Sequence, residues 1–257
     1  MTLLITKKSD IMKTKTTFIL FAALLFSNLM IIQLGCKKDE NNDAETFNCG
    51  EILTDPRDGQ LYTTVQIGDQ CWMAENLNIG EMIKGYYNMS NNGVIEKYCY
   101  NNDTSNCETY GGLYQWGEMM EYIIQGTQGI CPPGWHIPTD DEWKILEGTV
   151  DSQYPVGDPI WNNLGYRGYD AGLNLKSVSG WDTGGNGSGL YNYEALPGGY
   201  RNTNGNFHPL SGFAFFWSSS EFSSSHAWLR LLYYDFDDVA RHKFIKYFGL
   251  SVRCVQD

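Results

Sequence analysis

Seven cysteines are the residues of this 257-residue chain with the widest choice of chemistry. A cysteine can ligate a metal ion, attack a substrate or form a disulfide. The spacing argues against the first two uses, because the chain has no C-x-x-C pair and only His136 lies within a few residues of a cysteine, Cys131. Disulfides are therefore the favoured use, with a metal site or a catalytic thiol as the alternative.

Acidic residues offer a second chemistry at two places. The run 140–142 (Asp-Asp-Glu) has the composition of paired acids for hydrolysis, but it follows Thr139, and carboxylates are favoured in the first turn of a helix. Asp235, Asp237 and Asp238 could supply oxygen ligands to calcium or form an ordinary turn. We expect no bound cofactor or metal, with calcium as the exception that the sequence admits.

Motifs of known enzyme classes are missing from the sequence. It contains no G-x-S-x-G, H-E-x-x-H, P-loop or G-x-G-x-x-G pattern. We therefore expect a protein that is not an enzyme, and a cryptic hydrolase or oxidase is the less favoured alternative.

Aromatic side chains in a glycine- and asparagine-rich segment, residues 154–210, are the candidates for ligand binding. Trp161, Trp181 and Tyr191 lie there among residues typical of loops. Exposed rings can stack on sugar faces while neighbouring amides bind hydroxyl groups. The alternative is that the three rings only pack the interior of a loop-rich domain.

The first 35 residues have the charge and hydropathy order of an export signal. Two lysines precede an apolar run at 18–32, which is too short for a stable membrane span. Residues 33–36 (Gln-Leu-Gly-Cys) resemble the lipobox of bacterial lipoproteins, although Gln33 stands where an aliphatic residue is usual. We expect a signal peptide at 1–35 and a lipid attached to Cys36.

A polar segment follows and is predicted to tether a domain to the membrane. Residues 36–48 are rich in Lys, Asp, Glu and Asn, as flexible linkers are. Residues 38–40 (Lys-Asp-Glu) are similar to the signal that sends Bacteroidetes-type lipoproteins to the cell surface. We expect a protein held in the outer membrane through Cys36 with its domain outside the cell, and the periplasmic side is the alternative.

With Cys36 lipidated, six cysteines remain in an oxidising compartment and can form three disulfides. Two bridges would close short loops that contain turns, and the third would join the middle of the domain to its last strand. The expected pairs are Cys49–Cys71, Cys99–Cys107 and Cys131–Cys254. The third closes the longest loop, so by chain entropy it contributes most, about 5 kcal/mol.

Hydrophobic periodicity predicts the elements that must hold these residues in place. Alternation at 59–74 predicts a β-hairpin, and turn formers at 98–107 predict a stapled loop. Apolar residues three and four apart predict a helix at 113–124, and Thr139 with Glu142 can form the capping box of a second helix. Strands of a closing sheet are expected at 213–217, 227–234 and 248–255.

Composition and charge limit the fold and its partners. The chain has 28 Gly, 14% aromatic and 19% charged residues, which favours short strands, many turns and one α+β domain at 49–257. The formal charge is −12, and without the first 35 residues, which hold four Lys and one Asp, it is −15. A phosphate backbone would be repelled, so we expect no nucleic acid partner.

Six motifs in the domain resemble, in the same order, those of a known protein family. They are DGQLY at 58–62, VQIGDQCWMAENL at 65–77, GLYQW at 112–116, CPPGWHIPT at 131–139, FWSSSE at 216–221 and GLSVRCV at 249–255. On these motifs the chain is identified as a member of the Fibrobacter succinogenes major paralogous domain family, over nearly all of 49–257. The resemblance implies a C-type-lectin-like fold related to the formylglycine-generating enzymes.

The resemblance does not imply an activity. The related oxidases bind copper through a cysteine pair late in the domain, whereas this chain has no cysteine between Cys131 and Cys254. We expect a surface-anchored, non-catalytic binding module for glycans or extracellular matrix components. A structural or protein-interaction subunit of a cell-envelope assembly is the alternative.

Arg253 precedes the end of the chain. It is expected to anchor the last strand of the closing sheet through buried hydrogen bonds.

Overall fold

The computed structural model describes residues 47–123 and 128–257. The predicted signal peptide, Cys36 and the tether as far as residue 46 lie outside the described residues, and they stay predictions. Within the described part of the chain, each helix is too short or too polar to cross a bilayer. The described residues from 47 onward belong to one folding unit with α+β secondary structure.

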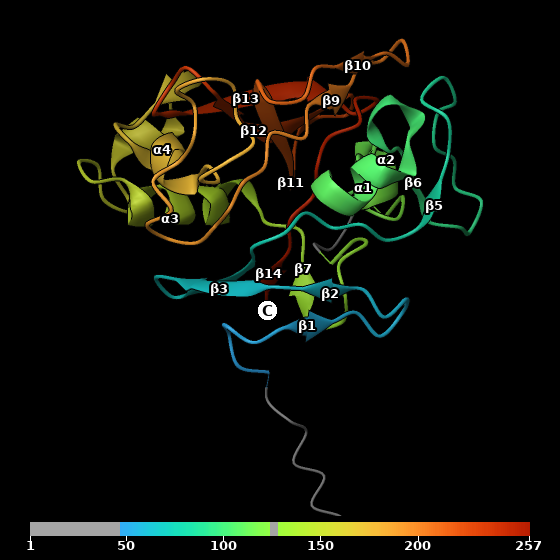
Figure 1. Cartoon of the computed structure of the whole chain (residues 1–257), viewed down its shortest axis with the longest axis horizontal. Coiled ribbons are helices and arrows are strands. Elements are labelled where there is room, and N and C mark those ends of the chain that lie inside the picture. The colour runs from blue at the N-terminus through green and yellow to red at the C-terminus, as the bar shows by residue number, and fades with distance from the viewer. Residues whose placement is uncertain (1–46, 124–127) are drawn as a thin grey trace, which may run out of the picture. The chain divides into compact units, whose positions relative to one another are not determined.

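The three longest strands, which are labelled in Figure 1, form a four-stranded antiparallel sheet together with one short strand. The strands, in spatial order, are β11 (Phe213–Ser223), β12 (His226–Tyr233), β13 (Val239–Ile245) and β8 (Gly165–Arg167). Successive side chains of a strand point to opposite faces. Phe215 and Trp217 therefore pack on one face, and Ala214 and Phe216 on the other.

A second four-stranded sheet contains the predicted hairpin. Its strands, in spatial order, are β3 (Thr64–Ile67), β4 (Gln70–Met73), β14 (Val255–Gln256) and β7 (Trp135–His136). Ile67 pairs with Gln70 around a two-residue turn in which Gly68 has φ 59°. This left-handed conformation is typical of glycine in tight hairpins, and the hairpin prediction is confirmed.

Three two-stranded sheets lie in the remaining loops. They pair β1 (Leu53–Thr54) with β2 (Leu61–Tyr62), β5 (Glu81–Met82) with β6 (Glu96–Lys97), and β9 (Tyr200–Arg201) with β10 (Phe207–His208). The segment 154–210 is largely irregular, as predicted. Its other elements are η2 (Pro159–Asn162), β8 and α4 (Ala171–Leu175).

Helix α3 (Asp140–Val150) begins at the predicted capping box. The Thr139 hydroxyl accepts a hydrogen bond from the Glu142 N–H at 3.2 Å, and the Thr139 N–H donates to the Glu142 carboxylate at 2.7 Å. The apolar side of α3 is buried, and the helix packs on α4 and β11 (Figure 1). The prediction of this helix is confirmed.

The helix predicted at 113–124 is wrong in extent, because in its described part, residues 113–123, only α2 (Trp116–Met119) is helical. Leu113 exchanges two backbone hydrogen bonds with Tyr98, and the Tyr114 N–H donates to Leu250. These bonds to distant extended segments replace the first helical turn. After α2, Glu121 and Tyr122 adopt left-handed φ angles of 51° and 57°, which end the helix.

Two further predictions miss regular structure. The segment 98–107 contains η1 (Tyr100–Asn102) and the start of α1 (Thr104–Tyr110), whose cap is Asp103, in place of a simple loop. The third strand of the closing sheet is β13, and the predicted strand at 248–255 makes isolated bridges and contributes only β14 to the other sheet. Seven-residue α1 lacks the apolar periodicity that identifies longer helices.

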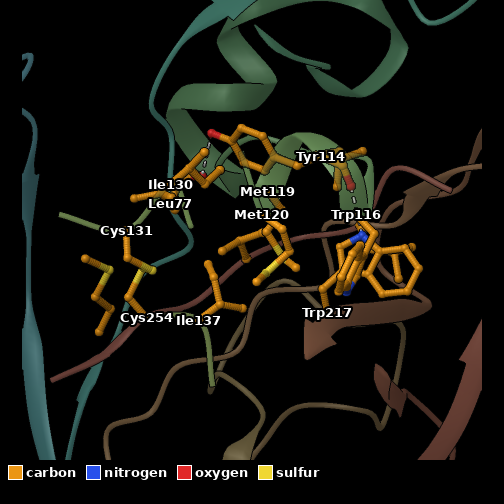
Figure 2. Packing of buried hydrophobic residues seen from close by; sticks show 14 of the residues in the cluster. Leu77, Tyr114, Trp116, Met119, Met120, Ile130, Cys131, Ile137, Trp217 and Cys254 are labelled. Carbon is orange, nitrogen blue, oxygen red and sulfur yellow. Dashed lines mark hydrogen bonds between the residues drawn. A yellow bond between two sulfur atoms is a disulfide. The ribbon is translucent and has the colours of Figure 1, made fainter. Parts of the chain in front are cut away.

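The β11–β12–β13–β8 sheet separates two apolar cores. Figure 2 shows part of the first core, in which Met120 and Ile137 lie between the Cys131–Cys254 disulfide and the Trp217 indole. The second core lies on the face covered by α3 and contains Trp72, Trp143, Trp161, Trp181, Phe216 and Leu232. Aromatic rings supply much of the buried volume of both cores, which suits a domain built largely from loops.

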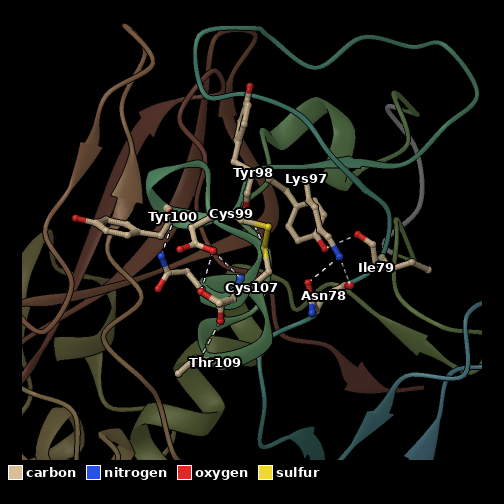
Figure 3. Close-up of a disulfide and its surroundings, with 12 residues drawn as sticks. Asn78, Ile79, Lys97, Tyr98, Cys99, Tyr100, Cys107 and Thr109 are labelled. Atoms are coloured by element: carbon tan, nitrogen blue, oxygen red, sulfur yellow. Dashed lines mark hydrogen bonds between the residues drawn. A yellow bond between two sulfur atoms is a disulfide. The ribbon is translucent and has the colours of Figure 1, made fainter.

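All three predicted disulfides are present. The sulfurs join Cys49 to Cys71, Cys99 to Cys107, and Cys131 to Cys254. Figure 3 shows the second bridge, which ties α1 to the strand-like segment before it. The third bridge closes a sequence separation of 123 residues and lies in the first core. The disulfide-stapled α+β class is therefore confirmed.

Candidate functional site

The tryptophans predicted to bind ligand are buried. Trp161 is 1% exposed and Trp181 is 7% exposed. The Trp161 indole N–H donates to the Pro155 carbonyl at 3.0 Å, and that of Trp181 donates to the Ala195 carbonyl at 3.1 Å. Tyr191 is half-buried and packs against the same core. Of the two interpretations of these residues, core packing holds for Trp161 and Trp181, which are therefore not available to stack on a sugar.

Exposed aromatic rings occur instead between β5 and β6 and after β13. Tyr86 and Tyr87 are 69% and 57% exposed, and Tyr247 is 58% exposed. The rings of Tyr86 and Tyr87 pack together with centroids 4.3 Å apart. These residues were not among the binding candidates predicted from the sequence, although the run Gly-Tyr-Tyr-Asn at 85–88 combines turn formers with two adjacent aromatics.

A buried arginine fixes the backbone beneath these tyrosines. The Arg201 guanidinium donates to the carbonyls of Gly85 at 2.8 Å, Tyr87 at 3.2 Å and Tyr247 at 2.9 Å. It also lies over the Tyr98 ring, 4.7 Å from the centroid. One guanidinium thus joins both tyrosine-bearing segments, and its planar fork fits several carbonyls at once.

An asparagine-rich turn packs beside Tyr86. Residues 202–206 (Asn-Thr-Asn-Gly-Asn) connect β9 to β10, and Asn204 and Asn206 are exposed. Here the backbones of Gly85 and Gly205 approach closely, since a Cβ on Gly205 would lie 2.8 Å from the Gly85 carbonyl oxygen. We call the exposed residues around this contact the tyrosine platform, which comprises Tyr86, Tyr87, Tyr247, Asn204 and Asn206.

The platform has the chemistry of a carbohydrate site. Tyrosine rings offer flat apolar faces to the C–H groups of a sugar, and the phenol and amide groups can exchange hydrogen bonds with its hydroxyls. Because Arg201 holds the backbone, the rings are presented with little loss of backbone entropy on binding. The arrangement favours binding and contains no paired nucleophile and base.

A second surface feature is a groove beside β3. Two hollows, of about 560 Å³ and 280 Å³, share Glu75 and Leu196 in their walls. The larger hollow is lined by Thr63–Gln66 on one side and by Asn192 and Glu194 on the other. We call the two hollows together the Glu75 groove. In the described part of the chain, no Lys, Arg or His lines it, so its charge is negative.

A buried arginine also holds one wall of the Glu75 groove. Arg253 donates hydrogen bonds to the carbonyls of Tyr193 and Glu194, and to the Asn76 side chain at 2.8 Å. Asn192 and Glu194 have left-handed φ angles of 52° and 53°. Arg253 therefore anchors the end of the chain through buried hydrogen bonds, as predicted, and fixes the strained loop that lines the groove.

The acidic run at 140–142 is structural. Asp140 is buried and binds Arg230 at 2.8 Å and Arg241 at 2.7 Å. Burial raises the pKa of Asp140, but the two guanidinium groups outweigh burial and hold that pKa well below its usual value. A carboxylate so strongly paired is a poor general acid or base, which agrees with the helix-capping interpretation of the sequence.

The sequence admits Asp235, Asp237 and Asp238 either as calcium ligands or as an ordinary turn. In the described part of the chain, no group of three His, Cys, Asp or Glu side chains has metal-site geometry. The turn that carries Asp235 is held by a lysine. The Lys176 ammonium donates to the carbonyls of Tyr234 at 3.3 Å and Phe236 at 2.9 Å. The positive charge that lies among the carbonyl oxygens of this turn is therefore the Lys176 ammonium.

Glu118 is a further buried carboxyl that could serve acid–base chemistry. Glu118 lines a hollow of about 200 Å³ with Asn91, Asn92 and Glu121. Burial raises the pKa of Glu118, while hydrogen bonds from the Glu96 N–H and the Tyr122 hydroxyl oppose the rise. Both carboxyl oxygens are thus already engaged in hydrogen bonds.

These features define a disulfide-stapled α+β domain in which one buried arginine, Arg201, fixes the two segments that carry exposed tyrosines. The chain belongs to the Fibrobacter succinogenes major domain family, whose model matches residues 65–256. No curated protein and no solved structure matches the chain. The C-type-lectin-like fold implied by the sequence motifs accordingly stays a prediction.

Proposed function

We propose that this protein is a surface-anchored lipoprotein of the outer membrane whose domain binds glycans without catalysis. The tyrosine platform carries the proposal, because two packed tyrosine rings, a third exposed ring and exposed amides lie on loops held by one buried arginine. The lipid on Cys36 would place the platform at the end of a flexible tether, where it can reach ligands outside the cell.

The charge of the domain favours neutral over acidic glycans. Without its first 35 residues the chain has a formal charge of −15, so sulfated or uronic acid polymers would be repelled at long range. Neutral glycans lack this penalty and gain stacking and hydroxyl contacts at Tyr86 and Tyr87. The expected ligand class is therefore neutral polysaccharide or neutral glycoprotein glycans.

The experiment is a glycan array probed with the oxidised, detergent-solubilised protein. Replacing Tyr86 and Tyr87 with Ala should remove binding to the glycans recognised by the native protein, whereas replacing both with Phe should retain most of it. Tyr169→Ala is the matched control, since Tyr169 is also exposed but lies outside the platform. Native protein that binds no glycan, or an alanine double variant that binds normally, would refute the proposal.

The lipid anchor needs its own measurement. Mass spectrometry of the membrane-extracted protein should find Cys36 as the N-terminal residue, carrying lipid, and protease added to intact cells should digest the domain. An intact leader would contradict the anchor. A domain protected until the outer membrane is broken would place it on the periplasmic side.

A further inference from the structure

The outer strand β3 has one edge that pairs with no other strand among the described residues. It pairs with β4 on one side only, in a four-stranded sheet that ends at β3. In this register Val65 and Ile67 exchange backbone hydrogen bonds with β4, as does Thr63, whose carbonyl accepts from Ala74 at 2.8 Å. The backbone N–H and C=O groups of Thr64 and Gln66 consequently point away from β4. Thr64 is buried, and its hydroxyl accepts from the Gly50 N–H and donates to the Glu51 carbonyl, whereas Gln66 is exposed.

The Glu75 groove follows this edge. Thr63 and Val65 point to one face of β3, and Thr64 and Gln66 point to the other, yet all four line the larger hollow. The hollow therefore runs beside β3 from Thr63 to Gln66. At about 3.4 Å per residue, the four residues of β3 match an added strand of about the same length.

Proteins commonly protect free edges with lysine, proline or a β-bulge. Strand β3 reads Thr-Val-Gln-Ile and pairs with β4 in unbroken register, so it has none of these three devices. The wall opposite the strand is also firm, because Arg253 holds the backbone of Glu194. The exposed Gln66 end of this edge, beside a hollow, has the geometry used by domains that bind peptides through strand addition.

The charge of the groove selects the occupant. Glu75 is exposed and Glu194 is half-buried, and no cationic side chain among the described residues lines the groove. Leu196 and Val65 add apolar contacts. From this complementarity we infer that β3 pairs with an extended segment of a partner protein in which basic and apolar residues alternate. This inference concerns a different surface from the tyrosine platform and does not depend on glycan binding.

The test measures binding of a fluorescent peptide, Lys-Val-Lys-Val-Lys-Val, to the full chain in detergent. The native protein should bind it more tightly than Glu-Val-Glu-Val-Glu-Val, and alternate N-methylation of the basic peptide should abolish binding because it removes backbone donors. Gln66→Pro removes one outward N–H of β3. The affinity of this variant for the basic peptide should therefore be about tenfold lower than that of the native protein, as expected for one lost hydrogen bond. Gln66→Ala keeps that N–H and is the matched control.

The charge of the groove is tested by Glu75→Gln combined with Glu194→Gln. This double variant should weaken binding of the basic peptide and reduce its dependence on salt. The Ala variant of Tyr86 and Tyr87 should leave peptide binding unchanged, which separates this surface from the platform. If Gln66→Pro unfolds the domain, as judged by melting, the N-methylated peptide still decides whether backbone pairing occurs.

Several outcomes would overturn the inference. Equal binding of the N-methylated peptide would show that charge alone attracts it, and equal binding of the acidic peptide would remove the role of Glu75 and Glu194. Tighter binding after deletion of residues 38–46 would identify the chain's own N-terminal segment as the occupant. A dimer of the native protein that Gln66→Pro dissociates would identify a second copy.

Discussion

Arg230 and Arg241 are direct cross-strand partners on β12 and β13, and both bind the carboxylate of Asp140. Like charges placed opposite each other in a sheet are destabilising unless they are compensated. Asp140 supplies the compensation from the first turn of α3. Two turns later on the helix, Glu147 binds Arg230 and Arg167, so the charge network fixes α3 against the sheet at two points.

Asp140→Asn should strongly destabilise the domain. The change keeps the size of the side chain but leaves two buried guanidinium groups short of negative charge, and breaking a buried pair costs about 3–5 kcal/mol. Asp141→Asn is the matched control, because Asp141 is exposed in the same helical turn. Urea unfolding of the oxidised protein measures the free energy of unfolding of both variants. If Asp140→Asn lowers this free energy no more than Asp141→Asn does, the charge network contributes nothing to stability.

His136 should make stability depend on pH near neutrality. Its Nδ1 lies 2.7 Å from Asp257 and its Nε2 lies 2.8 Å from Glu142. Burial lowers the pKa of His136, but the two carboxylates outweigh burial and raise it. A raised pKa gives stability that is fully present below the unfolded value, about 6.5, and is lost as pH rises through the folded value.

The free energy of unfolding should therefore fall between about pH 6 and about pH 9 by more in the native protein than in His136→Gln. An NMR titration of the His136 ring should give a pKa above that of the unfolded chain. Parallel pH curves for the two proteins would contradict the prediction, since the rest of the titrating groups are common to both.

The Cys131–Cys254 bridge should contribute more stability than Cys99–Cys107. Their sequence separations are 123 and 8 residues, and by chain entropy the longer loop is worth about 2 kcal/mol more. The measurement compares the free energies of unfolding of the two double Cys→Ala variants. Equal losses would mean that contacts in the unfolded chain, and not loop length, control the contribution.

Local features of this fold could be predicted from sequence because they depend on near neighbours. Thr139 and Glu142 are three residues apart and form the capping box without help from distant segments. The Gly68-Asp69 turn sets the hairpin register in the same way. The cysteine pairs could also be predicted from the sequence, because two of the three bridges close short loops.

The exposure of aromatic rings could not be predicted, because it depends on the tertiary fold. Trp161 and Tyr86 both lie in turn-rich segments, yet the first is buried beneath α3 and the second lies in solvent. Arg201 decides the position of Tyr86 and Tyr87, and it is more than a hundred residues away in the chain. Leu113 likewise has the spacing of a helical residue, but its backbone forms hydrogen bonds with Tyr98. Tyr98 lies outside the sequence window in which helical spacing is recognised.

Gly205→Ala should separate the two loops of the tyrosine platform. Gly205 has φ +89°, and an added Cβ would lie 2.8 Å from the Gly85 carbonyl oxygen and 2.9 Å from the Tyr86 Cα. The neighbouring backbone cannot move without stretching the Arg201 hydrogen bond to Gly85. We expect a lower melting temperature, faster proteolysis within 84–88, and weaker binding of any glycan that the native protein recognises.

Gly93→Ala is the control that isolates the contact. Gly93 has φ +82°, nearly the same backbone conformation, but an added Cβ there has no atom within 4 Å. Both substitutions therefore incur the cost of a left-handed alanine, about 1 kcal/mol, and only Gly205→Ala adds the collision with Gly85. If the two variants have the same melting temperature and are digested at the same rate, separating the two loops costs no stability, and Arg201 alone positions the tyrosines.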